Sequence, residues 1–458
     1  MSSSESSIQT PLPQASSAQV ASAKLFTRWR VMWISILILG LLVGIRLNGR
    51  DLLPSGAYGQ TADGTPQLNI ACGVTPRDLE ICRSLVDGFV ESYPTPIEVI
   101  VHDVLDDPKL YAAMLGVLLE TGSPDLDVMM VEPSQLGQLG PHLQNLNQQA
   151  AELTTGMFTE LVRAGQFGNR QVAIPYAPEL GVLYYRQDLL DKYGYLSAPM
   201  SWQELEALAF EIQRGERASG LPDFWGYVWQ GARQADLIDN LLEWFVAQGA
   251  PLLAAETNTV DLSSGDAARA LSYAQRWIGG VSPEAVLDYD EAAAVDAWLT
   301  GQVAFLRAGT GALSRIQQSP LRDVVGVARL PSGRSRSVAS LSGWYLAVHE
   351  TTNYPDEATA LIAFMTQAAF DTWRAEVGYL PVHEISYESP EILAQHPYYR
   401  LVPTTLDAIV NPPINRLGRD YAAVSNALIQ GVHSIIADKN MRPELALEAL
   451  EAHINSLY

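Results

Sequence analysis

Cysteine is almost absent from this chain of 458 residues, which contains only Cys72 and Cys82. Two cysteines cannot supply the four ligands of a structural zinc site, and the sequence has no histidine cluster to complete one. Such scarcity is typical of an exported protein, in which a stray thiol is a liability. We expect Cys72 to end a strand and Cys82 to lie in the first turns of the next helix. A short disulfide and two buried, reduced thiols both fit this spacing, and we favour the reduced thiols.

Positive charge is also scarce. The chain has 29 Lys and Arg against 51 Asp and Glu, so its formal net charge is −22, and no dense basic run follows the N-terminal flank. Nucleic acid and anionic lipid surfaces are therefore poor partners. The His-Glu-x-x-His and Gly-x-Ser-x-Gly motifs of metalloproteases and serine hydrolases are absent. We predict no nucleic-acid partner, no metal, no cofactor and no catalytic residue.

A long apolar run occurs near the N-terminus, where Val31–Ile45 contains no charged residue and follows a short basic stretch. We predict a disordered cytoplasmic tail at residues 1–30, an uncleaved signal anchor or transmembrane segment at 31–47 and a linker at 48–66. This topology places the body of the protein on the periplasmic or extracellular side of the cytoplasmic membrane. Secretion after signal cleavage is the alternative.

From Leu68 onwards the chain alternates between strand and helix patterns. Apolar strand patterns at Leu68–Cys72, Ile97–Val101 and Leu126–Val131 enclose two helix patterns, the second at Leu110–Leu119. This order predicts a parallel sheet with helices on both faces. A second series begins near Gln171, and the last quarter is predicted to be helical. With 48% hydrophobic residues, a body of this length favours two lobes over a single core.

Several motifs, taken in order, resemble the carbohydrate-binding proteins of ABC importers. They are Val172–Tyr176, Gly181–Leu190, Pro199–Leu205, Phe224–Gly231, Gly301–Arg307, Leu341–Trp344, Gly378–Val382 and Pro443–Leu447. The segment Phe224–Gly231 is similar to the trehalose/maltose-binding subgroup in particular. The resemblance covers about residues 68–458. It implies an α/β, two-lobed periplasmic-binding-protein type II fold, with mixed, mainly parallel sheets, helices on both faces, a ligand cleft between the lobes and a helical C-terminus.

The resemblance also implies where the lobes begin and end. The chain is expected to cross between them near Ala177–Leu180, Ser337–Ser340 and Ser386–Ile392. Lobe 1 then combines residues 67–177 with 340–385, and lobe 2 combines 180–336 with 392–458. The ligand is expected between the lobes, at the carboxyl ends of the strands.

A sugar has flat apolar faces ringed by hydroxyls, so its site needs aromatic side chains and fixed acceptors, above all carboxylates. Trp344 matches the binding tryptophan of the family, although it could be an ordinary buried strand residue. Glu132 ends an apolar strand, and we expect its carboxylate in the cleft. Glu179 corresponds to an acidic residue of the family, with a solvated loop position as the alternative. The other expected ligand-binding residues are Gly343, Asp78, Arg307, Tyr176, Tyr379 and Trp229.

Structural roles compete with binding at several of these positions. Asp78 is explained by helix capping, and we expect Arg307 to pair with a carboxylate of the cleft rather than with the ligand. Packing is the favoured interpretation for Tyr379, and the lobe 2 core for Trp229. The aromatic residues that relatives place after the counterpart of Arg307 are replaced by Ala308–Gly311. The sequence also departs from the family pattern at Ala177, which aligns with a family tyrosine, and near Pro412, which aligns with a family arginine. Together these departures predict that the lobe 2 side of the ligand cleft is roomier and less aromatic.

The sequence therefore predicts a solute-binding protein of an ABC importer that is not an enzyme. It is expected to bind a disaccharide, an oligosaccharide or a glycosylated compatible solute by lobe closure, to act as a monomer and to deliver the ligand to permease subunits in the membrane. One alternative is a receptor that presents its ligand to a membrane sensor. Another is a glycoside hydrolase in which Glu132 and Glu179 are the catalytic pair.

Overall fold

The computed structural model describes residues 61, 64–73, 76–102, 108–123, 125–255, 257, 259–376 and 378–457. The chain divides into two compact units, Met1–Gly64 and Thr65–Tyr458, and the description that follows concerns the second. The predicted tail, the predicted anchor and nearly all of the predicted linker lie outside the described residues. Within the described part of the chain, no helix combines the length and apolar character needed to cross a bilayer.

The first half of the main sheet is the predicted parallel β-α-β-α-β run. β1 (Gln67–Ala71) pairs in parallel with β2 (Glu98–His102) on one side and with β3 (Val128–Val131) on the other. The connections are α2 (Pro76–Ser92) and α3 (Pro108–Glu120). All four residues of β3 are buried, as expected of a strand covered on both faces. The predicted strand and helix order of this segment is confirmed, with bounds shifted by one or two residues.

Two long strands join the halves of the molecule. β6 (Ala173–Arg186) and β10 (Ala339–Val348) are antiparallel partners, and β10 also pairs with β3. The carboxyl half of β6 pairs with β8 (Val303–Gly309) and β9 (Val325–Ala328), and β8 pairs in parallel with β7 (Trp225–Val228). The strand order is β2-β1-β3-β10-β6-β8-β7, so the halves share one mixed sheet.

The sequence patterns predict two extended segments, Val172–Tyr176 and Gly181–Tyr185, but the structure forms the single strand β6 there. A proline has no N–H to give to a sheet ladder, so it is tolerated best beside an irregularity. The pairing of β6 with β10 has such an irregularity, a register shift between Trp344 and Tyr345. Pro178 lies opposite Gly343 and Pro175 opposite Tyr345, on either side of that shift.

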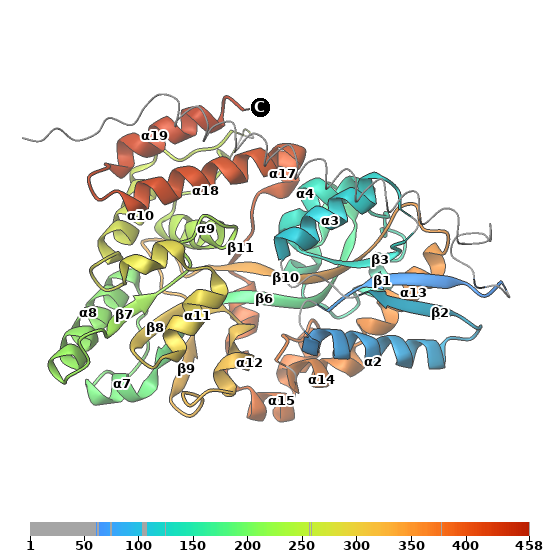
Figure 1. Cartoon of the computed structure of the whole chain (residues 1–458), viewed down its shortest axis with the longest axis horizontal. Coiled ribbons are helices and arrows are strands. Elements are labelled where there is room, and N and C mark those ends of the chain that lie inside the picture. Colours follow the sequence, from blue (N-terminus) through green and yellow to red (C-terminus); the bar gives the residue numbers. More distant parts are fainter. Residues whose placement is uncertain are drawn as a thin grey trace, which may run out of the picture. The chain divides into compact units, whose positions relative to one another are not determined.

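Helices cover both halves of the sheet (Figure 1). α2 packs against α13 beside β1 and β2, whereas α9 packs against α10 and α18 in the other half. The predicted helical C-terminus is confirmed by α18 and α19, which pack together. The remaining helices and short strands are α4 (Leu136–Leu139), α5 (Ala150–Leu153), α6 (Thr159–Ala164), β4 (Gln166–Phe167), β5 (Arg170–Gln171), α7 (Gln187–Lys192), α8 (Trp202–Ala218), α9 (Asp236–Gln248), α10 (Gly265–Trp277), α11 (Glu291–Leu299), α12 (Ala312–Gln317), α13 (Pro355–Met365), α14 (Asp371–Glu376), α15 (Pro390–Gln395), α16 (Val402–Leu406), β11 (Ile409–Val410), α17 (Ile414–Leu417), α18 (Tyr421–Ala437) and α19 (Pro443–Ile454).

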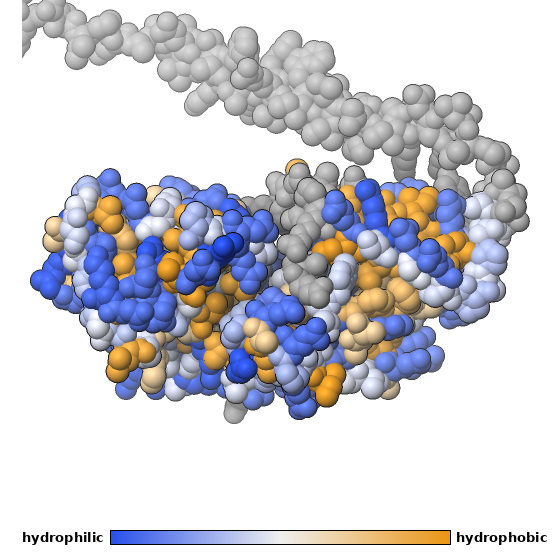
Figure 2. All heavy atoms as spheres, turned by 90° about the horizontal axis from the view of Figure 1, so that it is seen from below, coloured by the Kyte–Doolittle hydropathy of each residue, from blue (hydrophilic) through white to orange (hydrophobic). Residues whose placement is uncertain are grey.

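The surface is largely polar. Figure 2 shows one face on which hydrophilic residues predominate and hydrophobic residues form smaller patches between them. Large apolar side chains are exposed at scattered positions such as Val117, Leu196 and Met200. Scattered exposure of this kind is normal for a folded domain and needs no partner to explain it.

The two cysteines form a disulfide, so our preference for reduced thiols is wrong. Cys72 follows β1 directly and Cys82 lies in the second turn of α2, with a Cα–Cα distance of 6.2 Å. Both side chains are buried. The positions in strand and helix agree with the prediction. The pairing depends on the distance between the end of β1 and the second turn of α2, which sequence spacing alone does not give.

Candidate ligand-binding site

A cavity of about 440 Å³ lies where β6 and β10 pass from one half of the molecule to the other. Its wall is built by the segment after β3, by β6, β8 and β10, by the first residues of α9 and α11, and by Pro412 and Tyr421. Five of the nine predicted ligand-binding residues line it. They are Glu132, Glu179, Arg307, Gly343 and Trp344.

Trp344 contributes an aromatic side chain to the cavity wall. Its side chain is 8% exposed, and its ring meets Tyr111 edge-on at a centroid distance of 6.1 Å. Gly343 precedes it with φ of +89°, and a Cβ at that position would lie 2.7 Å from the backbone nitrogen of Glu179. Glycine therefore permits the close approach of β10 to β6 that places Trp344 beside the cavity.

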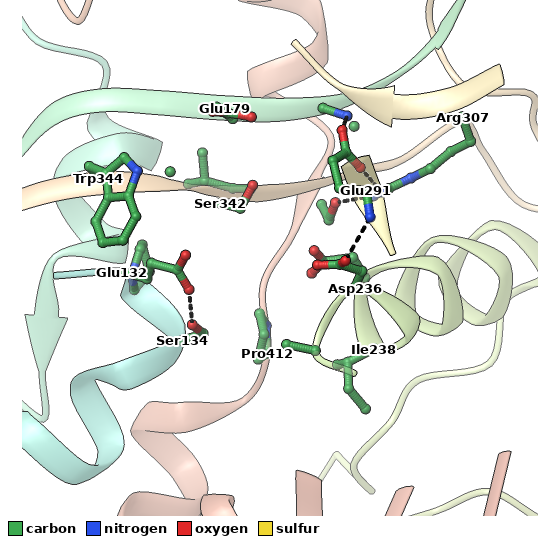
Figure 3. A pocket seen from close by; sticks show the side chains of 18 of the residues that line it. Glu132, Ser134, Glu179, Asp236, Ile238, Glu291, Arg307, Ser342, Trp344 and Pro412 are labelled. Carbon is green, nitrogen blue, oxygen red and sulfur yellow. Dashed lines mark hydrogen bonds and ion pairs between the residues drawn. The ribbon is translucent and has the colours of Figure 1, made fainter. Parts of the chain in front are cut away.

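Glu132 lies next to Trp344 and directs its carboxylate into the cavity (Figure 3). Its backbone begins the 3-10 turn Pro133–Gln135, in which its N–H donates to Gln135 Oε1 at 3.0 Å. The hydroxyl of Ser134 donates to Glu132 Oε2 at 3.0 Å. Burial is the main cause that raises the pKa of Glu132 to about 7, and the nearby charges of Asp236 and Glu179 add to the effect.

Glu179 and Glu291 bring two further carboxyls to the wall. The backbone N–H of Gly311 donates to Glu179 Oε2 at 3.4 Å, and that of Gly309 donates to Glu291 Oε1 at 2.7 Å. Burial raises the pKa of Glu179, and it raises that of Glu291 to about 7. A Cβ on Gly309 would lie 2.7 Å from Glu179 Oε2. Gly309 and Gly311 thus leave space for this carboxylate.

Asp236 and Asp239 complete the acidic side of the cavity, and sequence reasoning missed both of them together with Glu291. Asp236 is the first residue of α9, and its Oδ2 accepts a hydrogen bond from the backbone N–H of Glu291 at 3.1 Å. Burial raises the pKa of Asp239 well above its usual range, with the charge of Glu243 contributing. The available signal was two acids at the start of an apolar segment, a pattern that ordinarily indicates a helix amino end.

Arg307 forms an ion pair behind the cavity wall. Its guanidinium donates to both carboxylate oxygens of Glu243 and to Ser340 Oγ, and its Nη1 lies 4.0 Å from Glu291 Oε2. Arg307 was expected to pair with a carboxylate of the cleft, and the cleft carboxylate that it reaches is that of Glu291, at this distance. Its main partner, Glu243, is fully buried and does not line the cavity.

The other four predicted ligand-binding residues lie outside the cavity wall. The hydroxyl of Tyr379 donates to Asp78, the rings of Tyr379 and Tyr176 are 6.5 Å apart, and the guanidinium of Arg374 lies 5.5 Å from the Tyr176 ring. Trp229 has no exposed surface, meets Trp244 edge-on at 5.0 Å and donates from Nε1 to Ser282 Oγ at 3.3 Å. Trp229 therefore packs in the core, which is the interpretation that we favoured for this residue over ligand binding.

Metal binding has no support in the described part of the chain, where no three His, Cys, Asp or Glu side chains are arranged to hold an ion. The cavity instead combines one indole with several carboxylates and backbone donors. This combination can hold an organic molecule by stacking and by charge-assisted hydrogen bonds.

Comparisons with known proteins identify the family of this chain. A model of the bacterial extracellular solute-binding protein family matches residues 95–370. A protein of Deinococcus radiodurans, named a probable ABC transporter-binding protein, is 32% identical over 393 residues, which cover 84% of this chain and 92% of that protein.

Solved structures share the fold. Maltose-bound MalE3 of T. maritima has a TM-score of 0.77 and 27% identity, covering 86% of this chain and 100% of that one. The GacH receptor of Streptomyces glaucescens, solved unliganded and with acarbose, has a TM-score of 0.72 and covers 85% and 98%. At 18% identity it supports the fold alone. The predicted two-lobed type II fold is confirmed, and the chain belongs to family 1 of the bacterial extracellular solute-binding proteins, the carbohydrate-preferring binding components of ABC importers.

Proposed function

We propose that this protein captures a sugar-like solute in the cavity beside Trp344 and delivers it to an ABC permease. The observation that carries the proposal is the meeting of the Trp344 indole with the Glu132 and Glu179 carboxyls in one cavity. An indole face stacks on the apolar face of a sugar ring, and carboxylates accept hydrogen bonds from its hydroxyls. The maltose-bound relative of T. maritima, at 27% identity, supports a disaccharide or oligosaccharide as the ligand.

Capture is proposed to proceed by closure of the two lobes over the ligand. The ligand favours the closed form only to the extent that it binds that form more tightly, and closure removes water from its hydrogen bonds. Membership of the family implies a location on the periplasmic or extracellular side of the membrane. The signal anchor at residues 31–47 and the monomeric state remain predictions. The alternative function, a receptor that presents its ligand to a membrane sensor, uses the same binding step and differs only in its membrane partner.

The family consists of binding proteins rather than enzymes, and we propose that this chain leaves its ligand unchanged. Glu132 and Glu179 then act as hydrogen-bond acceptors, not as a catalytic pair. Incubation of the protein with each sugar that it binds tests this point, because released monosaccharide would identify a glycoside hydrolase.

Titration of tryptophan fluorescence against disaccharides, oligosaccharides and glycosylated osmolytes tests binding. We expect a saturable change with at least one saccharide, and small-angle scattering of the same mixture should show a smaller radius of gyration. Absence of any saturable change across the panel would contradict the proposed function. Saturable binding without compaction would contradict lobe closure alone.

A further inference from the structure

Negative charge is unbalanced on the wall of the cavity. Arg307 is the single cationic side chain among the described residues that line it. Five acidic side chains face it from four different parts of the chain, and the phenol of Tyr421 is the remaining titratable group. The five acids are Glu132, Glu179, Asp236, Asp239 and Glu291.

The charge of Arg307 offsets these five acids only in part: it lowers the pKa of Glu291 from 4.0 Å away, but its main partner is Glu243. Its Nε and Nη2 donate to the two carboxylate oxygens of Glu243 at 2.9 and 2.6 Å. The side chains are 4% and 0% exposed, so the pair is held away from water as well. Arg307 and Glu243 together therefore contribute no net charge to the cavity.

The pKa values of Glu132, Glu179, Asp239 and Glu291 are all raised by burial and by neighbouring negative charges, which is the expected result of like charges in a partly buried site. Burial is the largest cause at Glu132 and Glu291, and the Asp236 and Glu179 charges raise both pKa values further. Backbone N–H groups of Gly309, Gly311 and Glu291 donate to the carboxyls of Glu291, Glu179 and Asp236. The amino ends of α9 and α11 favour negative charge at Asp236, Asp239 and Glu291, which leaves Glu132 and Glu179 without that help.

A neutral sugar would make this imbalance worse. The sugar displaces water from the carboxylates and offers them hydroxyl donors. A hydrogen bond from a hydroxyl to a carboxylate is weaker than one from a cationic donor. Burying an ionised carboxylate without an opposite charge is costly. A ligand with its own positive charge removes the cost and strengthens each contact. The face of Trp344 suits such a ligand too, because an indole attracts a cation as well as an apolar sugar face.

We infer that the ligand is a hydroxyl-rich solute that carries at least one protonated amine, such as an amino sugar or an amine-bearing oligosaccharide. The inference rests on the proposed function and names the class of solute for the same cavity. It excludes anionic solutes, which the five carboxylates repel. A metal ion is not the missing charge, since no three metal-ligating side chains in the described residues are arranged to hold one.

Three disaccharides with one linkage separate charge from shape. De-N-acetylated chitobiose carries two amines, N,N′-diacetylchitobiose carries neutral amides, and cellobiose carries hydroxyls at the same positions. Isothermal titration of the full-length chain at pH 7 should give an affinity for the diamine roughly tenfold or more above that for either neutral sugar. Titration in buffers of different ionisation enthalpy should show proton release, because the cation lowers the raised pKa values of the carboxyls.

Variants locate the effect in the cavity. Asp239→Asn and Glu132→Gln each remove one negative charge with little change of shape, and each should reduce the preference for the diamine roughly tenfold. Asp323→Asn makes the same charge change at a side chain that is 81% exposed outside the cavity. The preference should be unchanged in that control.

The outcomes distinguish this inference from the proposed function. Equal or tighter binding of a neutral disaccharide overturns the inference and leaves the proposed function standing. Spermidine, a polyamine without hydroxyls, is the fourth compound to be titrated. If it binds and no saccharide does, the requirement for hydroxyls and the proposed function are overturned, while the preference for a cation survives. Failure of all four compounds to bind counts against both.

Discussion

The guanidinium of Arg307 donates two hydrogen bonds to the carboxylate of Glu243, and both side chains are almost completely buried. Glu243 also accepts from the backbone N–H of Ser340 at 3.0 Å and from its hydroxyl at 2.7 Å. One ion pair thus ties β8, α9 and β10 together at the back of the cavity wall.

Arg307→Met should destabilise the protein strongly. Removing one partner leaves Glu243 charged and buried without compensation, which costs about 3–5 kcal/mol. Arg315→Met is the matched control, because Arg315 pairs with Asp296 at the surface and both side chains are largely exposed. The free energy of unfolding, measured by urea denaturation, should fall by less than about 1 kcal/mol in the control. Equal losses in the two variants would contradict the assigned role of the buried pair.

Trp344→Ala should weaken ligand binding by roughly 100-fold, since aromatic anchors in a cavity often contribute about 2–4 kcal/mol. Trp344→Phe keeps an aromatic ring and should lose less. Trp225→Phe, which alters a half-buried tryptophan outside the cavity, is the control for changes in fluorescence. Calorimetric affinities provide the measurement. An unchanged affinity in Trp344→Ala would remove this residue from the site.

Gly343→Ala should destabilise the protein because the new Cβ meets the backbone of β6 and because φ of +89° is unfavourable for alanine. Gly168→Ala separates the two causes. Gly168 also has a positive φ, +62°, but a Cβ there meets nothing within 4 Å. We expect about 1–2 kcal/mol for the control and more for Gly343→Ala, measured by chemical denaturation. Similar values for both would show that β10 does not depend on this close approach.

The unliganded protein should lose stability as the pH rises through the pKa of about 7 shared by Glu132 and Glu291. Both pKa values are raised above the ordinary 4.5, so the folded state binds more protons than the unfolded state between those values. The cost of ionising these carboxyls is complete above pH 7 and absent below about pH 4.5.

The difference in melting temperature between the double variant Glu132→Gln/Glu291→Gln and the natural chain should therefore grow in favour of the variant from pH 5 to pH 8, by about 2 °C. Differential scanning calorimetry at both pH values measures the gain. Asp323→Asn, with one charge removed at the surface, should show a gain that is the same at both. A double variant with no pH-dependent gain would show that the pKa values of Glu132 and Glu291 are not raised in the folded protein.

Loss of the disulfide should destabilise the protein by about 2–3 kcal/mol, the value expected for a bond between residues that are 10 apart in sequence. Cys72→Ala/Cys82→Ala removes it without adding a buried hydroxyl. Denaturation with and without a reductant provides the measurement. The reductant should lower the stability of the natural chain and leave the double variant unchanged; insensitivity of the natural chain would contradict the bond.

Local sequence patterns predicted helices and strands well where the elements that follow one another in the chain also pack together in the buried sheet. Glu132 is an example, because an apolar run followed by an acid places the side chain at the end of a buried strand. Trp344, Gly343 and Glu179 were found through family motifs that happen to lie on the two strands shared by both halves.

Residues that reach the cavity from separate helix starts were not predictable in the same way. Asp236 and Glu291 are 55 residues apart in sequence and meet through a backbone hydrogen bond that only the tertiary fold creates. Each is also a good helix-start residue, so local chemistry explains it without a cavity. Tyr176 and Tyr379 show the opposite case, because their motifs resemble those of a binding site while their rings pack with Arg374 and Asp78.

The passage of β6 and β10 through both halves has a mechanical consequence. A rotation of one lobe against the other would twist these two paired strands, close to the point where Pro178 lies opposite Gly343. Glu179, Ser342, Gly343 and Trp344, which border that point, are also part of the cavity wall. A bound solute would therefore touch the flexing segment itself. Substitutions there should alter affinity and lobe movement together, whereas acids on α9 can be changed to tune recognition alone.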